Sequence, residues 1–206
     1  IDQRAAKRLL DILVSGVGII LTSPIMLIIA IAVKAYDRGP VFYFQDRLTL
    51  HGREFKICKF RSMCVDSEKN GARLASKHDS RITPVGNVLR NLHLDELPQL
   101  FNVFKGDMSL VGPRPERKTI MEEYEKELPE FYYRLKVKAG LTGYAQVYGK
   151  YNTTPYDKLK LDLFYIENYS FLLDIKLIFM TVKIFFQKEV SEGVDDRQIN
   201  ALKTSG

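Results

Sequence analysis

The sequence is poor in the residues that build metal sites and disulfide scaffolds. Its 206 residues include three histidines and two cysteines, Cys58 and Cys64, with no Cys-x-x-Cys pattern. Without clustered histidines, these cysteines predict reduced thiols in a cytosolic compartment and argue against a structural zinc site. No internal repeat or low-complexity tract divides the chain, so one ordinary domain with a real core is expected.

Charged residues are absent from one long stretch, between Ile12 and Val33. As a straight helix this run would extend about 33 Å, which matches a hydrocarbon core about 30 Å thick. The run is too long for a signal peptide, and no small-residue cleavage site follows it. A membrane helix is therefore expected, with a proline-kinked full span and a buried core helix as the alternatives.

Two features favour a membrane helix that enters, breaks and returns. Ser23-Pro24 lies at the middle of the run, where proline removes a backbone donor and costs roughly 3 kcal/mol unless the helix bends. The Ser23 hydroxyl can bond a carbonyl freed at the break. Lysine and arginine flank both ends of the run, and the positive-inside tendency places both ends on the cytoplasmic side. We predict a re-entrant membrane helix hairpin, broken at Ser23 and Pro24.

The rest of the chain combines short strands with several helices, so the predicted class is α+β, mainly helical. The expected strands cover residues 41–44 and 54–60 as a small hairpin, and the expected amphipathic helices cover 85–92, 97–104, 116–126, 128–137, 155–168 and 171–186. Residues 140–149 contain three glycines and predict a loop. The last helix is apolar over most of its circumference, which fits either a core helix or a helix lying in the membrane interface.

The formal net charge of +6 suggests an anionic partner. Nucleic acid, a phosphorylated substrate and anionic lipid are all candidates on charge alone. The sequence contains no zinc finger, RNA-recognition signature or basic-region zipper, so we do not expect nucleic acid.

An adjacent pair of acids, Asp95 and Glu96, precedes a predicted helix. Pro98 fits only the first turn of a helix, which makes Asp95 or its neighbour a plausible N-cap. The alternative is chemical: an aspartate has a reference pKa near 3.9, so it is ionised at neutral pH and can act as a nucleophile. The two roles partly conflict, because a capping oxygen is less free to attack.

One arginine, Arg114, stands between Pro113 and Pro115. Proline fixes its own φ angle and restricts the residue before it, so this guanidinium is pre-organised. Its planar fork of donors suits a phosphate or the polar edge of a base, although a rigid surface turn also explains the pattern.

Seven short motifs occur in a fixed order along the chain. They are KRLLD at 7–11, Ser23-Pro24, KFRSM at 59–63, LDELPQL at 94–100, GDMSLVGPRP at 106–115, GLTGYAQVYG at 140–149 and the segment 160–169. Each motif is weak alone, but together they resemble the bacterial sugar transferases, the monotopic phosphoglycosyl transferases that start glycan assembly on a polyprenyl phosphate. The resemblance covers nearly the whole chain and shows no departure at the key positions.

The resemblance implies an activity that composition does not. Family members move a sugar-1-phosphate from a nucleotide-sugar, usually a UDP-hexose, to undecaprenyl phosphate, and they release UMP. It implies an enzyme on the cytosolic face of the bacterial inner membrane, in contact with membrane lipids, and it leaves a homo-oligomer open. Residues 1–38 would be the re-entrant helix and residues 39–206 the cytosolic catalytic region. The start at Ile1 favours the catalytic domain of a longer member, although a short stand-alone member also fits.

The resemblance also implies residue roles. Asp95 would attack the sugar-bearing phosphate and form an aspartyl-phosphosugar intermediate, which the lipid phosphate then attacks. Mg²⁺ held at Asp95 would offset the diphosphate charge, and Glu96 would assist positioning, metal binding or proton handling. The expected phosphate and nucleotide contacts are Lys59, Arg61, Arg90 and Arg114.

Two other functions stay open at this point. One is a metal-dependent glycosyltransferase that moves the sugar alone and releases UDP. The other is a membrane-anchored binding module without catalysis. The nucleotide that is released, if any, distinguishes all three.

Overall fold

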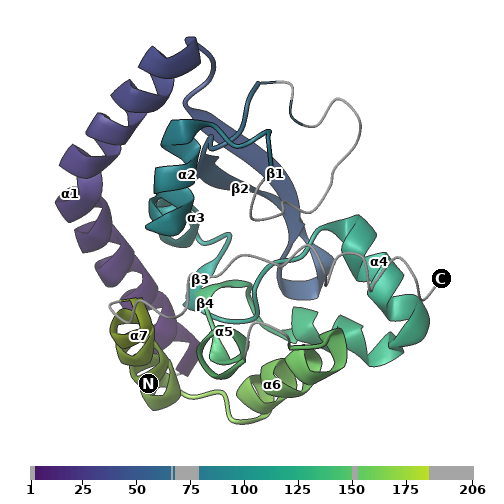
Figure 1. The fold of residues 1–206 in the computed structure, drawn as a ribbon. Helices are drawn as coiled ribbons and strands as arrows, with labels where there is room; N and C mark the ends of the chain where they lie inside the picture. Colours follow the sequence, from purple (N-terminus) through teal and green to yellow (C-terminus); the bar gives the residue numbers. More distant parts are fainter. Residues whose placement is uncertain (1–2, 66, 68–78, 150–152, 186–206) are drawn as a thin grey trace.

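The computed structural model describes residues 3–65, 67, 79–149 and 153–185. One long helix runs along the side of a body built from shorter helices and two small sheets (Figure 1). The helices are α1 (Gln3–Asp37), α2 (Pro84–Asn91), α3 (Gln99–Lys105), α4 (Lys118–Glu127), α5 (Tyr144–Tyr148), α6 (Pro155–Glu167) and α7 (Phe171–Phe185). Three 3₁₀ segments are η1 (Leu50–Gly52), η2 (Leu94–Glu96) and η3 (Pro129–Lys136), and the strands are β1 (Phe42–Leu48), β2 (Glu54–Phe60), β3 (Ser109–Val111) and β4 (Gly140–Thr142). The α+β, mainly helical class is confirmed.

Helix α1 is continuous through Ser23-Pro24, so the expected hairpin of two separate helices is not what the structure shows. The helix bends along its length instead (Figure 1), as helices do at proline. The missing N–H of Pro24 frees the carbonyl of Ile20, and the Ser23 hydroxyl donates to that carbonyl at 2.8 Å. The expected hydrogen bond of Ser23 is present, although the helix does not break at this position.

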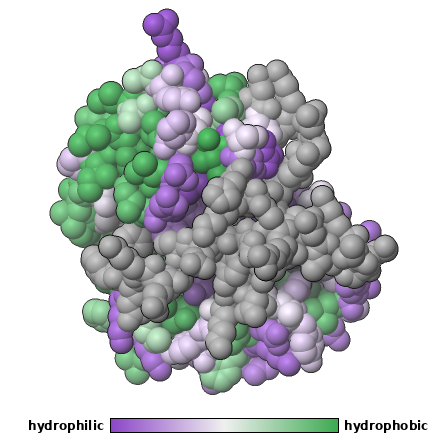
Figure 2. Space-filling model, viewed as in Figure 1, coloured by the Kyte–Doolittle hydropathy of each residue, from purple (hydrophilic) through white to green (hydrophobic). Residues whose placement is uncertain are grey.

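Most of the apolar surface of α1 is not covered by the protein. Only 17% of its most apolar 18-residue window is buried, and the helix is long and apolar enough to cross a membrane. Ile20 and Leu21 are among its exposed side chains. Figure 2 shows hydrophobic side chains gathered on the side of the molecule where α1 lies. This exposure excludes the alternative of a buried core helix and suggests membrane association.

The start of α1 is fastened to the body by buried charges. Lys7 donates to the carbonyl of Val111 in β3 at 2.9 Å and forms an ion pair with Asp174 of α7. Asp11 accepts a hydrogen bond from the N–H of Leu110 at 2.9 Å. These bonds hold α1 against the elements that carry the candidate site.

Two small sheets connect distant parts of the chain. Strands β1 and β2 form the expected antiparallel hairpin, in which Phe42 faces Phe60. Strands β3 and β4 pair in parallel, with Ser109 opposite Gly140. The predicted loop at 140–149 was wrong, because this segment contains β4 and α5. Its glycines permit close packing: a Cβ on Gly140 would lie 2.1 Å from the N atom of Gly112.

Helix α7 combines features of both alternatives considered for it. One face packs into the body, where Leu177 and Asp174 are almost fully buried. The opposite face exposes Leu172, Phe179 and Val182. The ion pair between Lys7 and Asp174 joins α7 to α1. The exposed apolar face of α7 therefore belongs to a helix that is attached to the long apolar helix.

Candidate active site

The acid pair lies in the short 3₁₀ segment η2, between α2 and α3. His93 precedes this segment in a left-handed conformation, with φ at 53°. Helix α3 begins only at Gln99; the N-cap position is occupied by Pro98, and no side chain caps the helix. The interpretation of Asp95 as an N-cap is therefore wrong, and its carboxylate is not used to start a helix.

Glu96 is fixed by two cations from separate elements. Lys59, near the end of β2, places its Nζ 2.7 Å from Glu96 Oε1. Arg114 approaches with both terminal nitrogens, Nη2 at 2.6 Å from Oε1 and Nη1 at 3.5 Å from Oε2. Burial alone would raise the pKa of Glu96, but the charges of Arg114 and Lys59 outweigh it and hold the pKa well below the ordinary value. Glu96 is thus an ionised, held carboxylate.

Asp95 has a different environment from its neighbour. Within the described part of the chain, no salt bridge or hydrogen bond engages its carboxylate. Burial and the adjacent charge of Glu96 raise the pKa of Asp95, while Lys59, Arg90 and His93 act in the opposite direction. The carboxylate of Asp95 therefore lies among cations without being occupied by any of them.

The four cations expected at the substrate divide into two groups. Lys59 and Arg114 contact Glu96, and Arg90 acts electrostatically on Asp95 while its Nε donates to Ser62 Oγ at 2.9 Å. Arg61 is engaged elsewhere. It forms a two-pronged ion pair with Asp37 at the end of α1 and donates to the Pro40 carbonyl at 2.6 Å. The contacts of Arg61 join α1 to the hairpin. They do not involve Asp95 or Glu96.

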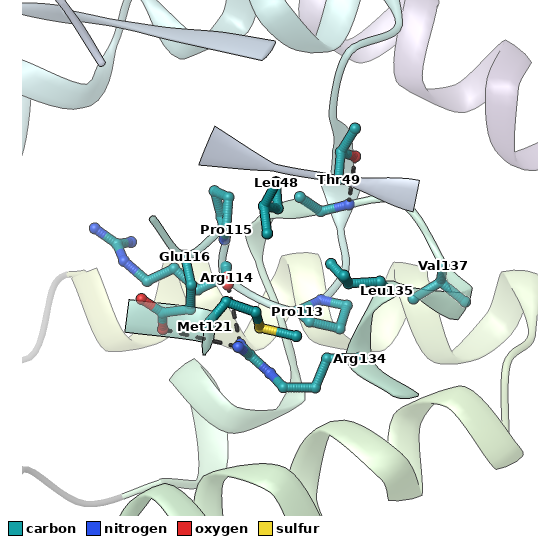
Figure 3. Close-up of a pocket in the computed structure, with 11 residues that line it drawn as sticks. Leu48, Thr49, Pro113, Arg114, Pro115, Glu116, Met121, Arg134, Leu135 and Val137 are labelled. Carbon is teal, nitrogen blue, oxygen red and sulfur yellow. Dashed lines mark hydrogen bonds and ion pairs between the residues drawn. The ribbon is translucent and has the colours of Figure 1, made fainter. Parts of the chain in front are cut away.

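The backbone that carries Arg114 is anchored at three successive carbonyls. The Gly140 N–H donates to Pro113 at 2.9 Å, Arg134 Nη2 donates to Arg114 at 2.9 Å, and Arg47 Nη1 donates to Pro115 at 3.2 Å. Figure 3 shows Arg134 reaching this turn from one side while the Arg114 guanidinium extends away from it. These three donors fix the backbone on both sides of Arg114 and so set the direction of its side chain.

A buried charge cluster contacts this segment through Arg134, and the sequence analysis did not predict it. Arg134 Nε lies 2.6 Å from Asp162 Oδ2, and both side chains are nearly inaccessible to solvent. Glu116 pairs with Lys158 and lies 3.8 Å from Arg134 Nη1. These four residues come from three separate segments, so their spacing carries no local signal. The local signal that could have indicated a buried ion pair was Asp162 itself, which follows Lys158 and Lys160 in a helix with an apolar face.

The site offers limited ligands for a metal. No group of three or more His, Cys, Asp or Glu side chains clusters anywhere in the residues that the structure describes. Glu96 is occupied by Lys59 and Arg114, which leaves the oxygens of Asp95. This donor set fits Mg²⁺, which is commonly held by one or two carboxylates, substrate phosphates and water.

Comparison with known proteins identifies the family of this fold and site. The profile of the family described as Bacterial sugar transferase matches residues 2–188. The chain is 46% identical over 180 residues to a UDP-N-acetylgalactosamine-undecaprenyl-phosphate N-acetylgalactosaminephosphotransferase of Aeromonas hydrophila, covering 86% of this chain and 43% of that protein. It is also 46% identical over 181 residues to a UDP-glucose:undecaprenyl-phosphate glucose-1-phosphate transferase of Klebsiella pneumoniae, covering 85% and 39% of the two chains.

A shorter relative aligns along most of its own length. It is an uncharacterized sugar transferase of Bacillus subtilis, 39% identical over 188 residues, which cover 91% of this chain and 89% of that protein. By contrast, the chain spans about two fifths of the Aeromonas and Klebsiella proteins. The resemblance drawn from the ordered motifs is confirmed: the chain belongs to the bacterial sugar transferase family.

Proposed function

We propose that this chain transfers a sugar-1-phosphate from a UDP-sugar to undecaprenyl phosphate and releases UMP. The names of its relatives support both substrates, since they are undecaprenyl-phosphate phosphotransferases for N-acetylgalactosamine-phosphate and glucose-1-phosphate. The observation that carries the proposal is the contrast between two adjacent acids. Glu96 is held by Lys59 and Arg114, whereas Asp95 is unengaged and lies among cations.

Asp95 would act as the nucleophile of a two-step transfer. Its carboxylate oxygen attacks the phosphorus that carries the sugar, the bond from that phosphorus to the UMP oxygen breaks, and UMP leaves. A phosphate oxygen of undecaprenyl phosphate then attacks the same phosphorus and displaces Asp95. The product is an undecaprenyl-diphospho-sugar, and the free carboxylate is regenerated.

Glu96 would position the cations of the site. Because its pKa is held far below neutrality, it is poorly suited to proton handling, and its ion pairs leave little room for metal binding. Its effect is to keep Lys59 and Arg114 beside Asp95, where their charge favours an anionic diphosphate. Arg90 would add charge to the same pocket. Arg61 is not included in this proposal, because it is committed to Asp37.

Mg²⁺ would be held by Asp95 together with substrate phosphate oxygens. When bound, it would neutralise part of the diphosphate charge and make the phosphorus more electrophilic. The protein groups described above would align the diphosphate and exclude competing orientations.

The membrane placement follows from α1 and the acceptor. We propose that α1 lies in the bacterial inner membrane with both ends toward the cytosol, and that the bend at Ser23-Pro24 makes this re-entrant path possible. The cations that flank both ends support this orientation. The carrier phosphate lies at the headgroup level, and the nucleotide-sugar is cytosolic. An active site beside α1 on the cytosolic face would reach both.

The decisive experiment is incubation of the membrane-inserted chain with undecaprenyl phosphate, Mg²⁺ and a panel of UDP-sugars. The proposal predicts UMP and a lipid-linked diphospho-sugar in equal amounts. Release of UDP without UMP would identify a glycosyltransferase that moves the sugar alone. Binding without release of any nucleotide would support a non-catalytic module. Accessibility of cysteines introduced at the two ends of α1 tests the topology, because labelling from opposite sides would contradict the re-entrant path.

A further inference from the structure

A groove of about 430 Å³ opens beside the site. Its walls come from four separate segments: residues 93–100, residues 110–114, residues 141–146 and the second half of α7. Its volume falls within the range of small-molecule pockets in proteins. The groove is therefore large enough to hold part of a substrate next to the acid pair.

The groove is charged at one end and mainly apolar along the rest, where Thr142, Gln146 and Thr181 add the polar groups of the lining. Glu96, Arg114 and His93 line the polar end, and the apolar walls include Leu97, Leu141 and Val182. A phosphate would be matched at the end that carries Arg114, where the guanidinium is partly exposed. A hydrocarbon chain would be matched along the remaining walls, because burial of apolar surface is favourable. The groove is therefore complementary to an amphiphile that has a charged head and an apolar tail.

One wall residue of the groove also contacts the apolar helix α1. Leu100, which lines the groove, also packs on α1: a Cβ placed on Gly18 would lie 3.2 Å from its Cδ1 atom. On the opposite wall, Val182 of α7 is half exposed. A tail that leaves the groove on this side meets the apolar surface of α1 and does not have to enter water.

We propose that this groove holds the first isoprene units of the lipid acceptor, with the acceptor phosphate at the Arg114 end. This inference rests on the proposed function and adds the place where the lipid is recognised. A UDP-sugar would be the poorer occupant, because most of the lining is leucine, isoleucine and valine, which leave the many polar groups of a sugar and a uridine unpaired, and the hydroxyls of Thr142 and Thr181 bond each other. The tail, in contrast, needs only shape and apolar surface, which these walls supply.

A pair of matched substitutions on α7 tests the inference. Val182→Trp would fill the groove with an apolar side chain, whereas Phe179→Trp makes the same new residue at an exposed position of α7 that does not line it. The KM for undecaprenyl phosphate is measured at fixed detergent and lipid content. We expect Val182→Trp to raise it at least about tenfold, the scale set by losing a few methylene contacts, and Phe179→Trp to leave it within about twofold.

The donor half of the reaction provides the internal control. Val182→Trp should leave the KM for the UDP-sugar unchanged, and single-turnover UMP release without acceptor should be unchanged too. An equal rise in acceptor KM for both variants would mean that α7 acts only as a membrane surface, and a raised KM for the UDP-sugar would assign the groove to the donor. Either result, or no effect of Val182→Trp, overturns the inference. Melting temperatures show whether each variant is folded.

A second measurement is independent of any substitution. A polyprenyl phosphate with a photoreactive diazirine in its first isoprene unit is cross-linked to the wild-type chain, with undecaprenyl phosphate as competitor. Competable adducts are expected on residues 97–100, 141–146 and 178–184. Adducts confined to α1 would contradict the groove. If the wild-type chain released no UMP at all, the proposed function itself would fail, which is a different result from normal turnover with labelling elsewhere.

Discussion

Two charge clusters meet at the Pro113–Pro115 turn, and they are organised differently. The site cluster consists of Asp95, Glu96, Lys59 and Arg114, on the side to which the Arg114 side chain points. The support cluster consists of Arg134, Asp162, Glu116 and Lys158, on the side where the Arg114 carbonyl is bound. Both contain two acids and two bases, so composition alone does not separate them.

The difference lies in burial and in pairing. In the support cluster Arg134 and Asp162 are 3% and 1% exposed, and all four side chains are engaged with one another. In the site cluster the Arg114 side chain is 43% exposed, and Asp95 is left unengaged in the described residues. A closed cluster stabilises a fold, whereas an open cluster with a spare carboxylate can bind and react. The following predictions test this division, beginning with the largest effect.

Loss of the spare carboxylate should remove activity without affecting the fold. Asp95→Asn is expected to reduce UMP release by at least about a thousandfold, the scale seen when a nucleophile is removed. The melting temperature should not fall, because no ion pair of the described structure is lost. Asp46→Asn, on the exposed surface of β1, is the matched control and should keep full activity. Near-normal turnover by Asp95→Asn would exclude it as the nucleophile.

Loss of a closed pair should mainly reduce stability. Arg134→Met leaves Asp162 buried without its partner, and breaking a buried pair costs about 3–5 kcal/mol. Arg114→Met removes a partly exposed partner, so its cost in stability should stay below about 1 kcal/mol while activity falls. Chemical denaturation measures both. The double variant Arg134→Met/Asp162→Leu should regain part of the loss, and equal destabilisation by the two arginine variants would contradict the division.

Removal of the held acid should change the pH dependence. The charge of Glu96 raises the pKa of Asp95, second only to burial. Glu96→Gln removes that charge and frees Lys59, so the pKa of Asp95 should fall and the carboxylate should stay ionised at lower pH. The acid limb of the rate profile is expected to move toward lower pH, with an overall loss of about 100-fold from misplaced cations. A limb that stays in place or moves upward would be inconsistent with this coupling.

Arg61 should affect stability more than substrate binding. Arg61→Lys loses the two-pronged contact with Asp37 and the bond to Pro40, at an expected cost of about 1–2 kcal/mol. The KM for the UDP-sugar should remain within about twofold of wild type, whereas Lys59→Met should raise it clearly. A large rise in KM for Arg61→Lys with unchanged stability would return Arg61 to the substrate site.

Local patterns predicted several elements because their causes are local. The hairpin around His51-Gly52 and the helices over 155–168 and 171–186 follow from turn residues and periodicity, with position 186 outside the described residues. The errors had both distant and local causes. Gly140–Thr142 became a strand because it pairs with β3, and Ser23-Pro24 did not split α1 because one hydroxyl replaced one lost donor.

The sequence by itself determined the family, the apolar helix and the identity of the two acids, because motif order and hydrophobic length are properties of the chain alone. Only the tertiary structure decided which acid is spare. Lys59 and Arg114 are distant from Glu96 in sequence, but the fold places both in contact with it. Arg61 instead forms its ion pair with Asp37. Charge pairing depends on distance in space, and the fold brings these residues together.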